Sequence, residues 1–111
     1  MINLMLDYTN KNLYKCEFDE VDLMSFKDLR RYIGCGECLI VDLREPEEFR
    51  RAHVRGAVNI EYNETGIRVP YEHRNSLIIF YCDSGKRALM TARNMKKLGY
   101  RTIAVADRFT H

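Results

Sequence analysis

The chain has 111 residues, 46% of them hydrophobic and 31% charged, with a formal net charge of +2. This length fits one domain, so residues 1–111 are predicted to form a single unit of the soluble globular class. So small a charge excludes a strongly basic surface for nucleic acid or membranes, and no apolar run approaches the roughly 18–20 residues that span a bilayer. The start lacks a basic segment followed by a long apolar stretch, so we predict no signal peptide and a cytoplasmic location.

The first 22 residues carry the weakest pattern, and we treat them as an extension or edge strands before a core at 23–107. Two short apolar runs, 2–6 and 13–18, flank a polar turn. This arrangement predicts an N-terminal β-hairpin packed at a sheet edge.

The next half of the chain contains a series of short elements. Ser25 and Asp28 have the spacing of an N-terminal capping box, and Pro46 suits the first turn of a helix. In chain order we predict a helix over 25–32, a buried strand over 39–43, a short helix over 45–51, a short strand over 57–60 and a loop over 63–76.

The clearest pattern lies near the end of the chain. Residues 77–81 are a continuous apolar run typical of a strand buried on both faces. An apolar stripe that includes Leu98 predicts a helix over 87–98, and residues 102–106 read as a second buried strand. Strand, helix and strand within about 30 residues form a βαβ unit with parallel strands, which predicts an α/β fold.

Cys35 and Cys38 form a single C-x-x-C motif. Zinc sites normally add a second cysteine pair or closely spaced histidines, and neither follows here. A redox pair is the other functional alternative. In a reducing compartment we expect free thiols instead of structural bridges, so we predict two incidental loop thiols, no metal and no cofactor.

Cys82 is the strongest candidate for chemistry. It follows a buried strand directly and precedes a helix, at the carboxyl edge where parallel sheets bind ligands. The amides of residues 83–87, the helix N-terminus and the cations Lys86 and Arg87 favour bound anions and a thiolate over a thiol. Asp83 opposes them with one negative charge. The alternative is a small buried cysteine beside a solvated helix start.

Four motifs occur in an order that resembles the rhodanese family. They are LIVDLREPEEF at 39–49, HVRGAVNI at 53–60, YCDSGKR at 81–87 and LGY at 98–100. Each alone is weak, and the set is specific. The resemblance implies a rhodanese-like three-layer fold, with a mainly parallel sheet of about five strands and helices on both faces.

The resemblance also implies a function. A family member of this kind is a sulfurtransferase that takes a sulfane sulfur from a small anionic donor such as thiosulfate and passes it to cyanide, a thiol or a protein acceptor. By position Cys82 is the nucleophile that becomes a persulfide, and Asp42 and Arg44 give structural support. The implied active-site loop comprises Asp83, Ser84, Gly85, Lys86 and Arg87.

Loop length separates sulfur transfer from phosphatase chemistry. Related cysteine phosphatases have five residues between cysteine and arginine, whereas four lie between Cys82 and Arg87. The shorter loop fits one sulfur atom better than a phosphoryl group. A binding or regulatory module with little turnover is the second alternative, and a small phosphatase is the third.

Three features depart from the family pattern. Ala52 stands where glycine is usual, and residues 63–76 look too irregular for the usual helix. The sequence given ends at His111, soon after the last predicted strand. We therefore expect a shortened C-terminus and an open pocket, whose wall is missing or comes from the N-terminal extension or a partner chain.

Overall fold

The computed structural model of the protein describes residues 20–109, so the hairpin predicted at 2–18 lies outside the described residues. The strands are β1 (Asp22–Met24), β2 (Cys38–Asp42), β3 (Val58–Asn59), β4 (Leu77–Tyr81) and β5 (Arg101–Val105). The α-helices are α2 (Phe26–Leu29), α3 (Pro46–Arg51) and α4 (Lys86–Lys97), and the 3-10 turns are η3 (Arg30–Tyr32) and η4 (Tyr71–His73).

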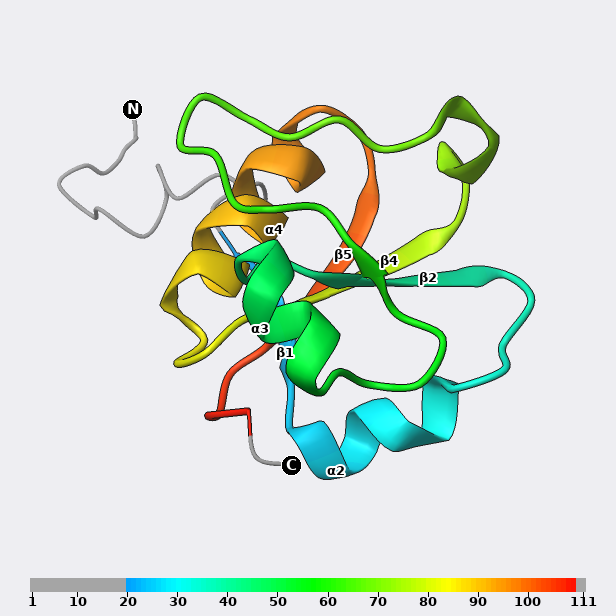
Figure 1. Cartoon of the computed structure of the whole chain (residues 1–111). Coiled ribbons are helices and arrows are strands. Elements are labelled where there is room, and N and C mark those ends of the chain that lie inside the picture. Colours follow the sequence, from blue (N-terminus) through cyan, green and yellow to red (C-terminus); the bar gives the residue numbers. More distant parts are fainter. Residues whose placement is uncertain (1–19, 110–111) are drawn as a thin grey trace, which may run out of the picture.

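The five strands form one parallel sheet in the order β1-β5-β4-β2-β3 (Figure 1). The central strand β4 pairs with β2 and β5, and its Ile79 lies opposite Ile40 and Ile103. This arrangement confirms the predicted α/β fold with a mainly parallel sheet of about five strands.

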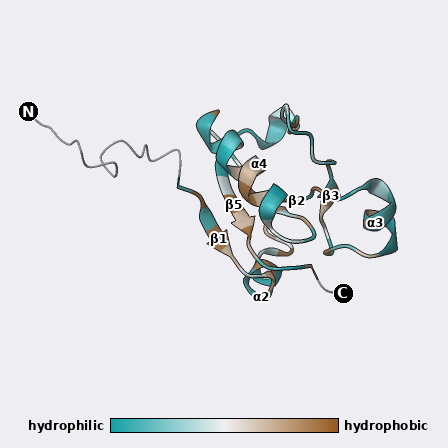
Figure 2. Cartoon of the chain, turned by 90° about the vertical axis from the view of Figure 1, so that its left-hand side faces the viewer, coloured by the Kyte–Doolittle hydropathy of each residue, from teal (hydrophilic) through white to brown (hydrophobic). Residues whose placement is uncertain are grey.

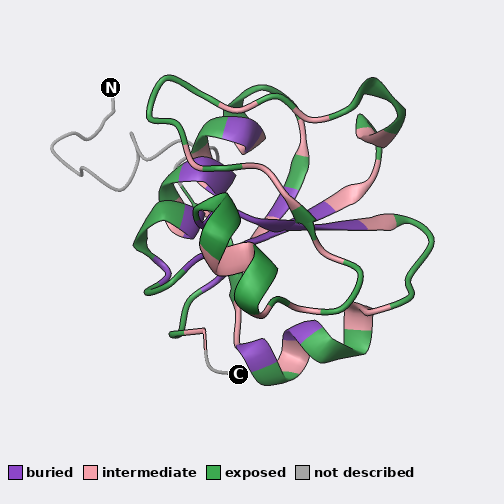
Figure 3. Ribbon diagram, in the orientation of Figure 1, coloured by how far each residue is buried: buried purple, intermediate pink, exposed green. Residues whose placement is uncertain are grey.

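Alternate residues of β4 supply two separate cores, because successive side chains of a strand point to opposite faces. On one face Phe80 packs with Ala88 and Ala92 of α4, and on the other Tyr81 packs with Phe26 of α2. Figure 3 shows the buried strands in the middle of the molecule. Helices cover both faces, as predicted. In Figure 2, α3 is mostly hydrophilic, and it contributes no buried residue.

Two details of the helices test the local patterns. The Ser25 hydroxyl accepts a hydrogen bond of 3.1 Å from the backbone N–H of Asp28, so the predicted cap forms. The inclusion of Leu98 in the apolar stripe was wrong. Leu98 is the C-cap of α4 and is 73% exposed, because the chain leaves the helix there toward Gly99, whose φ is +101°.

Other positions extend or refine the predictions. The prediction assigned no strand to β1, which pairs with β5 from Asp22 opposite Ile103 onward. Residues 63–76 contain only the η4 turn, in line with the predicted loop. Ala52 is extended, at φ −166°, a conformation that does not require glycine. Between residues 20 and 109, no helix is long and apolar enough to cross a bilayer.

Candidate functional site

Cys82 lies at the carboxyl edge of the sheet, one residue after the end of β4 and just before α4. Its side chain is buried, with 3% of the residue exposed, and its Sγ accepts a hydrogen bond of 3.2 Å from the backbone N–H of Gly85. Within residues 20–109 it is the free cysteine. The turn thus holds the sulfur against a backbone donor.

Gly85 shapes this turn. It is the N-cap of α4 with φ +90°, a left-handed conformation that side chains disfavour. A Cβ atom at Gly85 would overlap the backbone carbonyl of Ala106, lying 2.9 Å from its carbon. Both the conformation and the close approach of Ala106, the residue after β5, therefore require glycine at this position.

A cavity of about 270 Å³ opens beside Cys82. Its lining comprises Arg44, Cys82, Asp83, Ser84, Lys86 and Arg87. Lys86 and Arg87 outnumber Asp83 in this lining, and Arg44 is paired with a buried carboxylate, so the cavity keeps a positive charge that favours an anion. The Arg87 guanidinium carbon lies 5.2 Å from the ring centre of Tyr62, which holds the side chain at the cavity. Four of the five predicted loop residues line this cavity together with Arg44, whereas Gly85 does not line it.

Arg44 reaches the cavity from the end of β2, where Asp42 holds it. Asp42 is fully buried, and its carboxylate accepts bonds from Arg44 Nη2 at 2.8 Å, from Nε at 3.1 Å and from the Arg44 backbone N–H at 2.8 Å. Burial alone lowers the pKa of Arg44, but the hydrogen bonds and charge of Asp42 outweigh it and raise that pKa. Arg44 also donates to the Ala52 carbonyl. The pair connects two loops, and it places one guanidinium at the site, a role that the sequence analysis did not assign.

The C-terminal segment supplies a wall beside this arginine. The Arg44 guanidinium carbon lies 4.2 Å from the ring centre of Phe109, and the Phe109 ring stacks on Tyr81 at 5.4 Å. The backbone N–H of Phe109 donates to the Asp83 carbonyl at 3.1 Å. Arg44, Asp83 and Phe109 also line an adjoining cavity of about 240 Å³. Phe109 lines this adjoining cavity but not the cavity beside Cys82, so the expectation of an open Cys82 pocket stays a prediction.

Tyr81 lies beneath this wall. Its hydroxyl accepts a bond of 3.0 Å from the backbone N–H of Val54. Burial, followed by hydrogen bonding to Asp42, raises the pKa of Tyr81 strongly. In the folded protein, Tyr81 therefore stays a neutral phenol at pH values above the pKa of an ordinary tyrosine.

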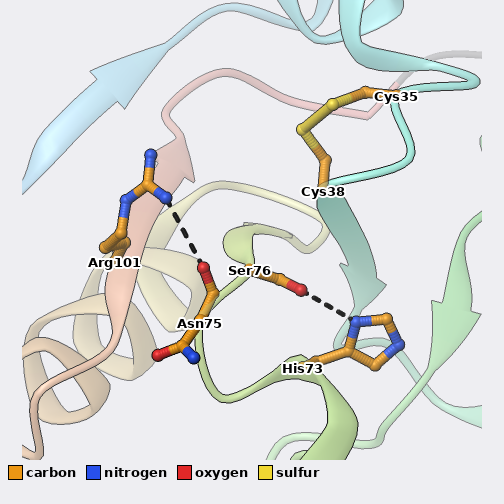
Figure 4. The surroundings of a disulfide bond; sticks show 6 residues. All are labelled: Cys35, Cys38, His73, Asn75, Ser76 and Arg101. Atoms are coloured by element: carbon orange, nitrogen blue, oxygen red, sulfur yellow. Dashed lines mark hydrogen bonds between the residues drawn. A yellow bond between two sulfur atoms is a disulfide. The ribbon is translucent and has the colours of Figure 1, made fainter.

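The C-x-x-C motif differs from its prediction. Cys35 and Cys38 form a disulfide, so the interpretation as two free loop thiols was wrong (Figure 4). The tight turn brings the two Cα atoms within 5.4 Å, which permits the bond. Cys38 begins β2 and pairs with Leu77, five residues before Cys82. The disulfide thus lies about 16 Å of strand away from Cys82, at the opposite edge of the sheet.

The rhodanese-like domain pattern matches residues 25–108, so the chain belongs to the rhodanese-like domain family. It is 38% identical over 85 residues to a Bacillus subtilis protein named "Putative sulfur carrier protein YrkF", covering 76% of this chain and 44% of that one.

A second relative and a solved structure extend the comparison. The chain is 30% identical over 91 residues to the thiosulfate:glutathione sulfurtransferase of Saccharomyces cerevisiae, covering 68% of this chain and 66% of that one. A human single-domain sulfurtransferase has the same fold, with a TM-score of 0.61 and 22% identity over 79% of this chain and 90% of that one. The chain thus spans less than two thirds of these two sequence relatives.

Proposed function

We propose that this chain, with residues 23–107 as its single rhodanese-like core, is a sulfurtransferase in which Cys82 carries a sulfane sulfur as a persulfide. The observation that carries the proposal is the buried Cys82 sulfur, bonded to the Gly85 amide, in a cavity lined by Arg44, Lys86 and Arg87. A nucleophile and an anion site share one small space. The names of the relatives support sulfur chemistry in the same family.

The reaction has two steps. The Cys82 thiolate attacks the outer sulfur of thiosulfate, the S–S bond of the donor breaks, and sulfite leaves with the electron pair. An acceptor thiolate then attacks the terminal sulfur of the persulfide and releases the Cys82 thiolate. Lys86 and Arg87 attract the donor, while Asp42 keeps Arg44 oriented. The yeast relative, named for glutathione, makes a small anionic thiol the favoured acceptor class.

The size of the loop favours this reaction over dephosphorylation. Four residues separate Cys82 from Arg87, and the Gly85 amide already points at the sulfur from within that turn. A persulfide adds one atom to Cys82, whereas a phosphoryl group would add a tetrahedral cluster of oxygens to the same space.

Mass spectrometry after thiosulfate treatment tests the proposal. Cys82 in the wild type should gain a single sulfur, about 32 Da, which a small thiol then removes. Cys82→Ser should retain its fold, because the side chains are nearly isosteric, and should gain nothing. Sulfur loading that persists in Cys82→Ser would exclude the mechanism. A wild type that stays unloaded would favour the binding-module alternative.

A further inference from the structure

The Cys35–Cys38 disulfide is a second sulfur centre that the proposed transfer does not use. It lies where β2 begins, beside the turn that leads into β4, and Figure 4 draws it together with the His73–Ser76 turn. Within residues 20–109, no group of three or more possible ligands could hold a metal there. The role of the two cysteines must therefore be sought in the disulfide itself.

The disulfide contributes little to the closure of its own turn. It joins residues only three positions apart, and the chain-entropy benefit of a cross-link falls as the closed loop shortens. A backbone bond already closes the same turn, from Cys38 N–H to the Cys35 carbonyl at 3.3 Å, and the preceding turn is closed by Cys35 N–H donating to the Tyr32 carbonyl at 3.0 Å. A further backbone hydrogen bond, donated by the Leu77 N–H to the Glu37 carbonyl at 3.0 Å, connects the turn to β4. The backbone can therefore keep its shape with the disulfide open.

The disulfide is also accessible to a small molecule. Cys35 is exposed, Cys38 is half-buried, and both line a cavity of about 250 Å³. Tyr32 and Arg55 line the same cavity. A guanidinium beside a disulfide attracts an anionic thiol and stabilises the thiolate that leaves when the bond opens.

From these observations we infer that Cys35 and Cys38 form a reversible dithiol–disulfide pair that exchanges with small anionic thiols, independently of Cys82. The incoming thiol loses its proton and attacks the exposed Cys35 sulfur. The Cys35–Cys38 bond breaks, and Cys38 leaves as a thiolate that then takes up a proton. A second thiol loses its proton and attacks the mixed disulfide at the sulfur of the first thiol, and Cys35 leaves as a thiolate that takes up a proton. Two thiols are oxidised to one small disulfide, and the protein pair gains two electrons.

The test uses the full chain carrying Cys82→Ser, so that persulfide chemistry cannot interfere. The protein is equilibrated in mixtures of reduced and oxidised glutathione, alkylated and digested, and the peptide that contains Cys35 and Cys38 is quantified. We expect the same end point from the oxidised and the reduced side, with an unchanged circular dichroism spectrum. A disulfide that glutathione opens only in denaturant, or that does not re-form, would overturn the inference.

Single serine variants test the order of attack. Cys38→Ser should accumulate glutathione as a mixed disulfide on Cys35, because the resolving sulfur is gone. Cys35→Ser should form the corresponding adduct on Cys38 at least about tenfold more slowly, since Cys38 is half-buried. Equal rates would contradict the assignment of Cys35 as the attacked sulfur.

Arg55→Gln tests the class of thiol. It should slow opening by glutathione about two- to fivefold more than opening by neutral 2-mercaptoethanol, the range of a surface charge pair. Arg50→Gln, at an exposed arginine of α3 outside this cavity, is the matched control. Equal slowing with both thiols would overturn the choice of an anionic thiol.

Independence from Cys82 is measured in the wild-type background. Cys35→Ser/Cys38→Ser should load sulfur on Cys82 within about threefold of the wild-type rate. A loss of tenfold or more would contradict two separate sites. This result stands apart from the failure of Cys82 to load sulfur at all, which would remove only the proposed transfer.

Discussion

Arg44 and Arg87 enter the Cys82 cavity from different elements and are held in different ways. Asp42 fixes Arg44 through several hydrogen bonds, and Phe109 covers its guanidinium. Arg87 is exposed in the first turn of α4, and its guanidinium lies over the Tyr62 ring. A change at Arg87 should therefore act on the anion more than on the fold.

Substitutions of Arg87 separate charge from shape. Lysine keeps the charge but loses the planar fork, and alanine loses both. We expect the rate with thiosulfate to fall from wild type to Arg87→Lys to Arg87→Ala, with the last step costing about 1.5–3 kcal/mol, or roughly 10–150-fold. A neutral alkylating agent should react with Cys82 at nearly the same rate in all three proteins. Equal losses toward both reagents would indicate a collapsed loop.

Tyr81 gives the site a stability that depends on pH. The pKa of its phenol is higher in the folded protein than in the unfolded chain, because of burial and the bond to Asp42. This group therefore stabilises the fold fully below about pH 10, the ordinary tyrosine pKa, and the stabilisation is lost as the pH rises beyond that value toward the pKa of the folded state.

Urea unfolding between pH 8 and 11 measures this effect. Tyr81→Phe should be less stable than wild type at pH 8 by about 1 kcal/mol, since the Val54 N–H loses its acceptor. The difference should shrink above about pH 10, where only the wild type must hold an ionisable phenol in the core. Tyr71→Phe, at a tyrosine that is 76% exposed, is the control. A difference that stays constant with pH would contradict the role of Tyr81.

At the scale of elements, the sequence predicts those helices and strands whose own residues carry the pattern. The strands β2, β4 and β5 are mostly apolar, and α4 has an apolar stripe that ends near a glycine. β1 has three residues and an exposed Leu23, so its strand exists because it pairs with β5. The two strands lie far apart in the sequence, so the residues around β1 do not reveal the pairing, and the strand was not predicted.

The turn between β4 and α4 can be tested as an element. Gly85→Ala should destabilise the protein by about 2–4 kcal/mol and remove sulfur loading, because the left-handed conformation and the Ala106 carbonyl both oppose a side chain. Gly56→Ala is the matched control. Its φ of +85° is nearly the same, yet a Cβ there meets no atom within 4 Å. It should cost about 1 kcal/mol and leave loading intact. Similar losses in both variants would contradict the steric argument.

At the scale of the whole molecule, the segment after β5 connects regions that are far apart in the chain. The Ala106 N–H donates to the Met24 carbonyl at 2.9 Å, and the Asp107 carboxylate accepts from the Phe26 N–H at 3.0 Å. Phe109 then reaches Asp83 and covers Arg44. An aromatic residue soon after the last strand was the available signal in the sequence. Its position depends on partners from distant segments, among them Phe26, Arg44 and Asp83, so local reasoning could not place it.

The same three-dimensional dependence explains the rest of the site. The motif at 81–87 predicted the neighbourhood of Cys82, because strand, turn and helix follow one another directly. Arg44 joins that neighbourhood only because β2 and β4 are adjacent and parallel, so that both chains emerge at one edge of the sheet. The Cys35–Cys38 bond reflects turn geometry, which residue types alone left open among thiols, metal and redox pair.

Phe109→Ala tests whether the returning segment matters to both stability and the site. Its half-buried ring lies 5.4 Å from the ring centres of Phe26 and Tyr81 and 4.2 Å from the Arg44 guanidinium carbon. Removing it should lower the free energy of unfolding by about 1–3 kcal/mol, less than for a fully buried phenylalanine. Thiosulfate reactivity should fall about two- to fivefold, because Arg44 loses its cover and becomes less fixed.

Two variants make the result specific. Phe109→Leu retains apolar volume but no ring, so it should recover most of the stability and less of the thiosulfate rate. Arg108→Ala, at the exposed neighbouring position, should change neither quantity. Urea unfolding and the thiosulfate rate are measured on the same preparations. If Phe109→Ala matches wild type in both, the segment after β5 does not act as a wall, and the cavity beside Cys82 depends on the loop and the two arginines alone.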